Sequence, residues 1–371
     1  MARYIWQLPV WPDLTWNDSA LIHPLGKARQ AQGELFARAS YFELNLQAEV
    51  LTEDAFTTSA IEGEILNRES VRSSVARRLG LPTAGLPAPD RYIDGLVEML
   101  VNATRSHRKT LTASMLKAWQ AALFPTGYAG LTKISTGGWR KGKDPMQVVS
   151  GPVGKEKVHF EAPPAARVPA EVKQFLAWFK SSQDRLDGLV RAAVAHLRFV
   201  TIHPFADGNG RIARAIADMA LAQDEKRDFR LYSMSARINA EREQYYHILE
   251  QTQQGDGDIT GWIIWFLECL YRAMQQSGAE IQKAMDKAVF WQNAACHNLN
   301  DRQKKAVNKL LDAGPGGFEG GLTNKKYRAM TRTTRETAKR DMAQLVNMGL
   351  LKKNPGGGRS TSYDLAWPAL T

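Results

Sequence analysis

Hydrophobic and polar positions alternate along most of this chain with the period of a helix. Between Lys27 and Leu51, apolar side chains recur at steps of three and four residues, which predicts one long helix with a buried face. The same pattern predicts further helices over residues 52–61, 71–79, 90–105, 111–123, 168–182, 187–202, 209–223, 236–254 and 258–290. The body of the chain is therefore expected to be mainly α.

One stretch departs from this helical pattern. Between Gly127 and Pro164, glycines and prolines separate short alternating pieces, which are typical of strands and turns. The pieces Gln147-Val-Val149 and Lys157-Val-His-Phe160 predict a small β-hairpin within the helical body.

A separate α+β unit is expected to begin near Leu299. Helical patterns over residues 301–313, over 323–330 and from Thr333 onward precede two strand-like pieces around a glycine turn. Thr333-Thr-Arg-Glu336 has the spacing of a capping box, which satisfies free N–H groups at a helix start. Three helices and a hairpin in this order resemble a winged helix-turn-helix. The expected domains are residues 1–89, 90–298 and 299–371.

Composition excludes several classes of protein. Of the 371 residues, 44% are hydrophobic and 23% are charged, as in an ordinary soluble domain. The two cysteines are too few for a disulfide framework or a cysteine-rich zinc site. The longest apolar run is too short to span a bilayer, and the first residues lack the apolar core of a signal peptide. We therefore expect a cytoplasmic protein with no membrane partner.

The basic charge is concentrated near the C-terminus. The net charge is +11, and residues 325–359 contain ten lysines and arginines against two acids. Arg335 and Lys339 fall on the last expected helix, and Lys352 and Lys353 fall on the expected wing. A basic winged helix is typical of a protein that binds duplex DNA. The alternatives are a solvated basic surface and a surface that holds an acidic target protein.

The densest group of chemically reactive side chains lies in His203-Pro-Phe-Ala-Asp-Gly-Asn-Gly-Arg-Ile-Ala-Arg214. Its Asp-Gly-Asn-Gly turn is expected at a helix N-terminus, where free N–H groups and the helix dipole favour phosphate. Arg211 and Arg214 can donate to phosphate oxygens, and the Asp207 carboxylate suits a phosphate-bound Mg²⁺. His203 can take a proton near neutral pH. Each feature alone is also typical of a plain turn, but the combination favours a phosphate site.

This segment resembles the signature of the Fic family (filamentation induced by cAMP), His-x-Phe-x-Asp/Glu-Gly-Asn-Gly-Arg-x-x-Arg, at every fixed position. The arrangement of the chain is similar to the family from about Asp90 to Leu270. The resemblance implies a helical Fic core with a β-hairpin flap that docks a target segment in extended form. The flap would run from Gly138 to Pro152, with target contacts at Gln147, Val148 and Val149.

The resemblance also implies a reaction, namely transfer of AMP from ATP to a Ser, Thr or Tyr hydroxyl of a target protein. By position, His203 would be the base, Phe205 would anchor the loop and Asp207 would bind Mg²⁺. Arg214 would hold the γ-phosphate. The residues implied to bind the phosphates are Gly208, Asn209, Gly210, Arg211 and Arg214.

An earlier segment, Thr58-Ser-Ala-Ile-Glu-Gly63, fits the inhibitory pattern of the same family, Ser/Thr-x-x-x-Glu-Gly/Asn. Its implied role is that Glu62 pairs with Arg214 and displaces the γ-phosphate. A carboxylate that reaches a phosphate-binding arginine does compete with phosphate. The N-terminal segments Tyr4-Ile-Trp-Gln and Trp11-Pro also resemble the arm of a bacterial Fic subfamily that carries a C-terminal winged helix.

The leading interpretation is thus a protein adenylyltransferase that uses ATP and Mg²⁺ and is inhibited by its own Glu62. One alternative is the reverse reaction, in which Glu62 positions water to remove AMP from a protein. Another is a transcription regulator whose core senses nucleotide and whose winged helix binds duplex DNA. Transfer of UMP or phosphocholine fits the phosphate cradle equally well, and a homodimer is compatible with the sequence.

Overall fold

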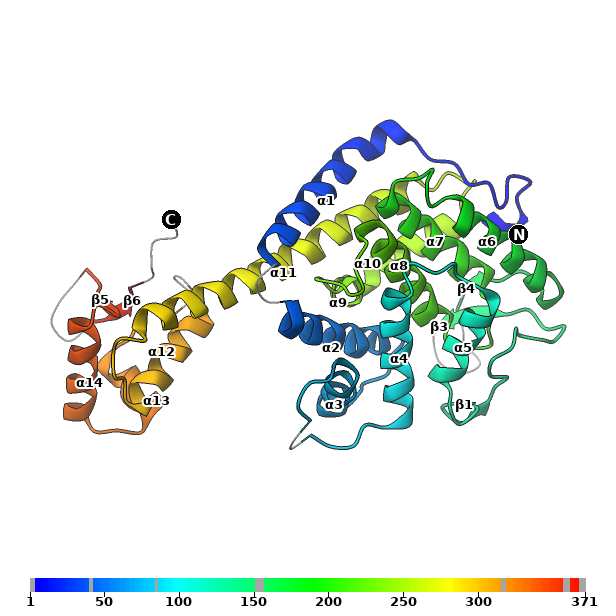
Figure 1. The fold of residues 1–371 in the computed structure, drawn as a ribbon. Helices are drawn as coiled ribbons and strands as arrows, with labels where there is room; N and C mark the ends of the chain where they lie inside the picture. The colour runs from blue at the N-terminus through cyan, green and yellow to red at the C-terminus, as the bar shows by residue number, and fades with distance from the viewer. Residues whose placement is uncertain are drawn as a thin grey trace. The chain divides into compact units, whose positions relative to one another are not determined.

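The computed structural model describes residues 4–39, 43–83, 86–150, 157–314, 318–355 and 361–366. The chain divides into two compact units, Met1–Ser277 and Gly278–Thr371, which are both rich in helix (Figure 1). The division falls inside α11 (Thr260–Ala294), whereas the sequence placed a boundary at residue 299. None of the described helices is both long and apolar enough to cross a membrane.

The first unit is mainly helical, as the hydrophobic pattern predicted. Its helices are α1 (Asp18–Ala39), α2 (Glu43–Ile61), α3 (Arg68–Leu79), α4 (Arg91–Arg105), α5 (Ala113–Leu123), α6 (Val168–Ser181), α7 (Gly188–Ile202), α8 (Asn209–Glu225), α9 (Met234–Ala240), α10 (Arg242–Gln253) and the first part of α11, with short 3-10 turns at η1 (Ile5–Gln7) and η2 (Ala165–Arg167). Its strands are β1 (Tyr128–Ala129), β2 (Thr132–Lys133), β3 (Gln147–Ser150) and β4 (Lys157–Glu161).

The central pair of helices, α7 and α8, positions the signature segment. Every residue of α7 from Leu189 to Ile202 is buried, as is nearly every residue of α8. Helices that are buried on all sides lie in the interior of a domain. The chain leaves α7 through His203 and enters α8 through Gly208, and both residues adopt left-handed backbone angles. The loop between them is thus held at both ends by the core.

Three of the expected helices have wrong bounds. The single helix predicted over residues 27–51 is divided between α1, which ends at Ala39, and α2, which begins at Glu43, and residues 40–42 lie outside the described residues. The helix expected over residues 52–61 is the second part of α2, which continues through residue 51. The helix predicted over residues 236–254 is also two helices, α9 and α10, with Glu241 between them.

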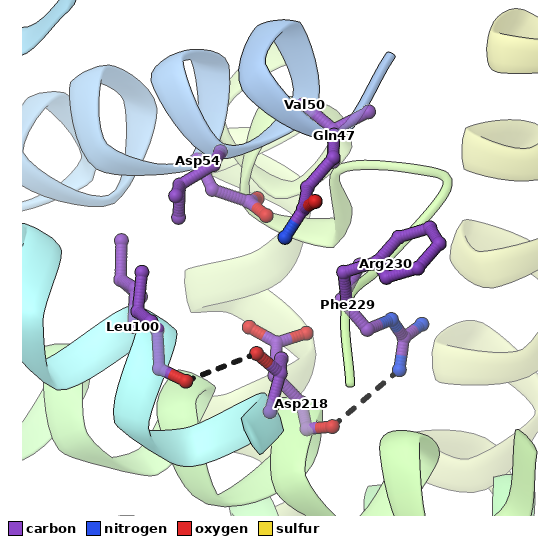
Figure 2. Close-up of a pocket in the computed structure, with 10 residues that line it drawn as sticks. Gln47, Val50, Asp54, Leu100, Asp218, Phe229 and Arg230 are labelled. Carbon is purple, nitrogen blue, oxygen red and sulfur yellow. Dashed lines mark hydrogen bonds between the residues drawn. The ribbon is translucent and has the colours of Figure 1, made fainter. Parts of the chain in front are cut away.

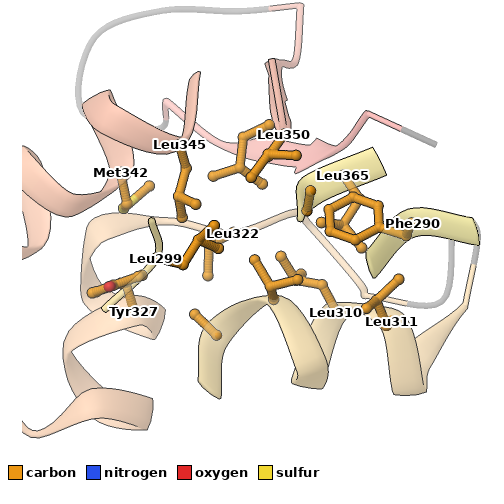
Figure 3. Close-up of a cluster of buried hydrophobic side chains, with 14 of the residues drawn as sticks. Phe290, Leu299, Leu310, Leu311, Leu322, Tyr327, Met342, Leu345, Leu350 and Leu365 are labelled. Atoms are coloured by element: carbon orange, nitrogen blue, oxygen red, sulfur yellow. The ribbon is translucent and has the colours of Figure 1, made fainter. Parts of the chain in front are cut away.

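The second unit has its own apolar core. Helices α12 (Asp301–Ala313), α13 (Asn324–Thr331) and α14 (Arg335–Asn347) precede strands β5 (Leu351–Lys353) and β6 (Tyr363–Leu365), which pair antiparallel. Figure 3 shows the leucines of these elements directed toward one another, together with Phe290 of α11. The elements follow the order expected for a winged helix, which itself stays a prediction. The expected wing tip, with Arg359, lies outside the described residues.

The expected capping box at the start of α14 is shifted by one residue. The N-cap is Thr334, whose Oγ1 accepts a hydrogen bond from the backbone N–H of Thr337 at 3.3 Å. Glu336 is therefore one position too early to complete a box. Arg332, with left-handed backbone angles, ends α13 two residues before this N-cap.

A buried group of charges connects α2 to α8. Figure 2 shows Asp54 of α2 and Asp218 of α8 beside Arg230, around a cavity of about 20 Å³. The Ser233 hydroxyl donates to the Asp54 carboxylate, and Arg230 also lies 3.5 Å from the buried carboxylate of Glu225. Three carboxylates therefore share one guanidinium away from water, which favours keeping a proton on one of them.

This cluster makes stability depend on pH in a definite direction. Burial raises the pKa of Asp218 to about 6 despite the opposing charge of Arg230, while Glu225 raises it further. A raised pKa in the folded state contributes stability below the unfolded value, 3.8, and loses it as the pH rises toward 6. Urea titrations at pH 4 and pH 7 should show the free energy of unfolding of the wild type, measured relative to Asp218→Asn, falling by about 2 kcal/mol between these pH values. A difference that stays constant between pH 4 and pH 7 would contradict this.

Candidate functional site

His203 is held in one orientation and one tautomer. It caps the C-terminus of α7 with φ 50° and ψ 57°, and its backbone N–H donates to the Phe199 carbonyl at 3.0 Å. Its ring Nδ1 lies 3.0 Å from the Val200 carbonyl, so Nδ1 carries the hydrogen and Nε2 is left with a lone pair. Burial lowers the pKa of His203, so the neutral ring is favoured near neutral pH.

The loop after His203 is anchored by Phe205 and Asn209. The Phe205 ring is fully buried, and its centroid lies 4.9 Å from that of Trp139. The Asn209 amide accepts from the Phe205 N–H and donates to the Phe205 carbonyl, both at 2.9 Å. The Asn209 side chain therefore fixes the loop, and its backbone alone remains for the anion hole expected from the sequence.

The first turn of α8 provides unpaired backbone donors. The first hydrogen bond of the helix runs from the Ile212 N–H to the Gly208 carbonyl at 3.0 Å, so the preceding N–H groups have no partner within the helix. Gly208 has φ +87°, which favours glycine, and a Cβ there would lie 3.0 Å from the Phe124 ring. At Gly210, a Cβ would lie only 2.3 Å from Oε1 of Glu62. The Glu62 carboxylate thus lies directly against this turn.

Glu62 is placed by the C-terminus of α2. The Gly63 N–H donates to the Ala60 carbonyl, the Glu64 N–H donates to the Ser59 carbonyl, and Gly63 has φ +86°. These two bonds and the left-handed glycine form a Schellman motif, which ends a helix in a fixed geometry. The Tyr246 hydroxyl of α10 also donates to the carbonyl of Ile61 at 3.1 Å. Gly63 of the inhibitory pattern is thus needed for the left-handed turn that ends α2.

Three hydrogen bonds hold Arg214 against this end of α2. Its Nε donates to Thr58 Oγ1 at 2.7 Å, and its Nη2 donates to the Thr58 carbonyl at 2.9 Å and to Glu62 Oε1 at 2.7 Å. Its Nη1 is buried and is without a partner among the described residues. Burial disfavours the charged form of Glu62, but Arg214 outweighs it, and the pKa of Glu62 is lowered. The carboxylate is therefore ionised at neutral pH.

The sequence analysis missed a second acid at this site. Glu64 Oε2 accepts from Arg211 Nη1 at 2.9 Å, and the Tyr92 hydroxyl of α4 bonds to both groups. Burial raises the pKa of Tyr92 to about 12, so the phenol keeps its proton. The short spacing in Glu62-Gly-Glu64 was the available signal, because a Schellman turn directs two nearby carboxylates toward α8.

His203, Gly210 and Glu62 line one cavity of about 630 Å³. The opposite wall is formed by α10, including Tyr246, and by the β-hairpin. In that hairpin Val148 pairs with Phe160, and Val149 pairs with Val158 after a bulge. Three residues expected to dock a target lie on β3, where Gln147 and Val149 are exposed and Val148 is partly buried. Gly151 and Pro152, at the expected flap tip, lie outside the described residues.

Asp207 is the one expected metal ligand. Its side chain is about half exposed, at 45%, and its Oδ1 accepts from the Gly208 N–H at 2.5 Å and lies 3.5 Å from Arg211. The described residues contain no group of three or more acids, histidines or cysteines that could hold an ion by themselves. A Mg²⁺ that keeps one carboxylate and takes its other ligands from phosphates fits this arrangement.

The basic residues expected to contact DNA are all exposed in the second unit. Arg335 and Lys339 lie on the first half of α14, and Lys352 and Lys353 lie on β5. Within the described part of the second unit, nothing covers these side chains, so a binding partner could reach them.

Comparison with known proteins places the signature in a family. Residues 110–221 match the Fic/DOC family. Residues 4–81, which include Glu62, match a family described as a domain of unknown function (DUF4172). A Fic family protein from Desulfovibrio desulfuricans has a similar structure, with a TM-score of 0.53 and 20% identity over 97% of this chain and 99% of that one. At this identity the likeness establishes the Fic fold alone.

Two curated relatives match this chain at low coverage. The protein adenylyltransferase Fic of Drosophila mojavensis is 35% identical over 86 residues, which are 23% of this chain and 16% of that protein. A probable protein adenylyltransferase of Aquifex aeolicus is 28% identical over 96 residues, which are 26% of this chain and 27% of that protein. The match thus spans well under half of either relative.

Proposed function

We propose that the first unit is a protein adenylyltransferase, which transfers AMP from ATP to a hydroxyl side chain of a target protein. The observation that carries the proposal is that His203, with a free Nε2, opens into the same cavity as Gly210 at the N-terminus of α8. A proton acceptor beside a phosphate-binding turn is what transfer of a nucleotidyl group to a hydroxyl requires. The names of the two curated relatives support AMPylation in general.

The proposed reaction assigns a role to each group. Nε2 of His203 takes the proton of the target hydroxyl, whose oxygen forms a bond to the α-phosphorus of ATP. The bond from that phosphorus to the bridging oxygen breaks, and pyrophosphate leaves. The backbone N–H groups of Asn209 and Gly210 in the first turn of α8 stabilise the negative charge, as donors fixed before the reaction do in general. Arg211 and Arg214 hold the outer phosphates.

Mg²⁺ would be held by Asp207 together with the phosphates. When bound there, the ion supplies positive charge to phosphate oxygens. The protein itself would contribute one carboxylate oxygen, that of Asp207, from the loop that also carries the backbone donors.

The hairpin supports a proposed docking mode for the target. The β4 edge is occupied, because the Trp6 indole donates to the Glu161 carbonyl at 2.6 Å and the Gln254 amide donates to the His159 carbonyl at 3.0 Å. The exposed residues of β3, Gln147 and Val149, lie on the other strand. An extended target segment would add to β3, where main-chain bonds give affinity and side-chain pockets give specificity.

We further propose that Glu62 inhibits the enzyme. The carboxylate occupies the turn at Gly210 and binds Arg214, both of which the outermost phosphate of ATP would need. Because the pair is fixed at both ends, phosphate must compete with a preformed contact. The Glu62 side chain is 31% exposed, so a nucleotide can reach the carboxylate and displace it.

The first test concerns the base. His203→Ala should lower AMP transfer by about 10²–10⁴-fold, since only the proton acceptor is lost. Binding of ATP should change little, because the cradle consists of backbone and arginine. The measurement is incorporation of α-labelled ATP into the protein itself and into lysate proteins, with the exposed His23→Ala as a matched control. Incorporation by His203→Ala close to that of the wild type would contradict the assignment of His203 as the base.

The second test concerns inhibition. Glu62→Ala should raise AMP incorporation by about ten- to a hundredfold, since a hydrogen bond to a charged group contributes about 1.5–3 kcal/mol. Glu49→Ala, an exposed acid on the same helix, should leave incorporation unchanged. Equal incorporation by Glu62→Ala and wild type would contradict the inhibitory role. Loss of an AMP-removing activity in Glu62→Ala would instead favour the reverse reaction.

A second candidate function, duplex DNA binding, is favoured by the exposure of four basic side chains in the second unit. If they contact phosphates, the logarithm of the affinity of the full chain should fall linearly with the logarithm of salt, by about 0.9 per contact. Changing Lys352 and Lys353 to Ala should therefore make the slope shallower by up to about two units. Absence of salt-dependent binding to any duplex at low ionic strength would exclude this function.

A further inference from the structure

Arg140 lies in the segment that leads into the β-hairpin, and it contacts four backbone carbonyls. Its backbone N–H donates to the Pro204 carbonyl at 2.9 Å, and its side-chain Nε donates to the His203 carbonyl at 2.7 Å. Its Nη2 donates to Pro163 and lies 3.5 Å from the carbonyl of Ile202. The side chain is 7% exposed. One arginine thus ties the start and the end of the hairpin to the peptide groups on either side of His203.

These carbonyls need an external donor. The last carbonyls of a helix have no partner within it and carry the negative end of the helix dipole. At His203 the chain also turns into the left-handed region, which is unfavourable for a residue with a side chain. A planar guanidinium directs its N–H groups to several oxygens in one fixed plane, a geometry that the compact ammonium of a lysine does not reproduce. Arg140 therefore stabilises the turn that points the His203 ring into the cavity.

The charge of Arg140 is not balanced by an acid. Among the described residues it has no ion pair, and burial lowers its pKa. Arg140 therefore disfavours a second positive charge on His203. The other charged groups that act on His203 are Glu62, at the end of α2, and Asp207, in the loop, and both favour the protonated ring. Arg140 is the group that opposes them.

We propose that Arg140 is a positioning residue for His203, which fixes the left-handed turn after α7 and so directs the imidazole into the cavity without touching the nucleotide. The inference rests on the proposed function, since it assigns His203 the role of base. It extends that function to a residue that lies 63 positions away in the sequence and forms no part of the phosphate cradle.

The experiment compares Arg140→Gln and Arg140→Lys in a Glu62→Ala parent. Both changes remove the guanidinium that bonds to the carbonyls around His203. Both should therefore lower kcat, by up to about 10²-fold if the His203 ring moves by about 1 Å. The KM for ATP should stay within about twofold. The acidic limb of the pH profile should move to higher pH in Arg140→Gln, which lacks the charge, and should stay in place in Arg140→Lys. Arg108→Gln, at an exposed site, serves as the control.

A second measurement does not depend on transfer. NMR titration of the His203 ring, assigned by comparison with His203→Ala, should show a higher pKa in Arg140→Gln than in the parent. An unchanged kcat, a rise in KM alone, or an unchanged His203 titration would overturn the proposal. If Arg140→Gln does not fold, the kcat of Arg140→Lys decides. If the parent transfers no AMP, the proposed function fails, while the titration still tests Arg140.

Discussion

The contact between Glu62 and Arg214 is the interaction on which the site depends. It joins the end of α2 to the first turns of α8 at 2.7 Å, and the arginine is almost completely buried. Other contacts hold both partners in place: the Schellman turn at Gly63 positions Glu62, and two hydrogen bonds to Thr58 position Arg214. Removing one partner of such a pair leaves a buried charge alone, which is costly, unless another anion replaces it. A phosphate group is an anion of suitable shape.

The rest of the site follows from the junction of two buried helices. The chain must turn sharply between α7 and α8, and left-handed angles at His203 and Gly208 make the turn possible. One end of the loop carries the proton acceptor, and the other end carries backbone donors. Arg140 and Asn209 hold the loop between them through bonds to its carbonyls and N–H groups. The distance from base to cradle is thus set by the core rather than by the loop itself.

The sequence predicted the parts of this protein whose signal is local. The helical class, the hairpin at residues 147–160 and the set of residues from His203 to Arg214 could be read from spacing and from the signature. The division between α9 and α10 at Glu241 was missed, because packing rather than spacing decides it. Glu64, Tyr92 and Arg140 were missed for a related reason. Their partners lie from 28 to 147 residues away, and such contacts appear only when the helices pack.

The most direct measurement is the affinity of the protein for ATP and for ADP, obtained by calorimetry in the wild type, Glu62→Ala and Glu49→Ala. If Glu62 occupies the place of the outermost phosphate, Glu62→Ala should bind ATP about tenfold more tightly or better, a gain of about 1.4 kcal/mol. Its affinity for ADP should stay within about twofold, and Glu49→Ala should match the wild type for both nucleotides. Equal affinity of wild type and Glu62→Ala for ATP, or an equal gain for ADP, would contradict the account.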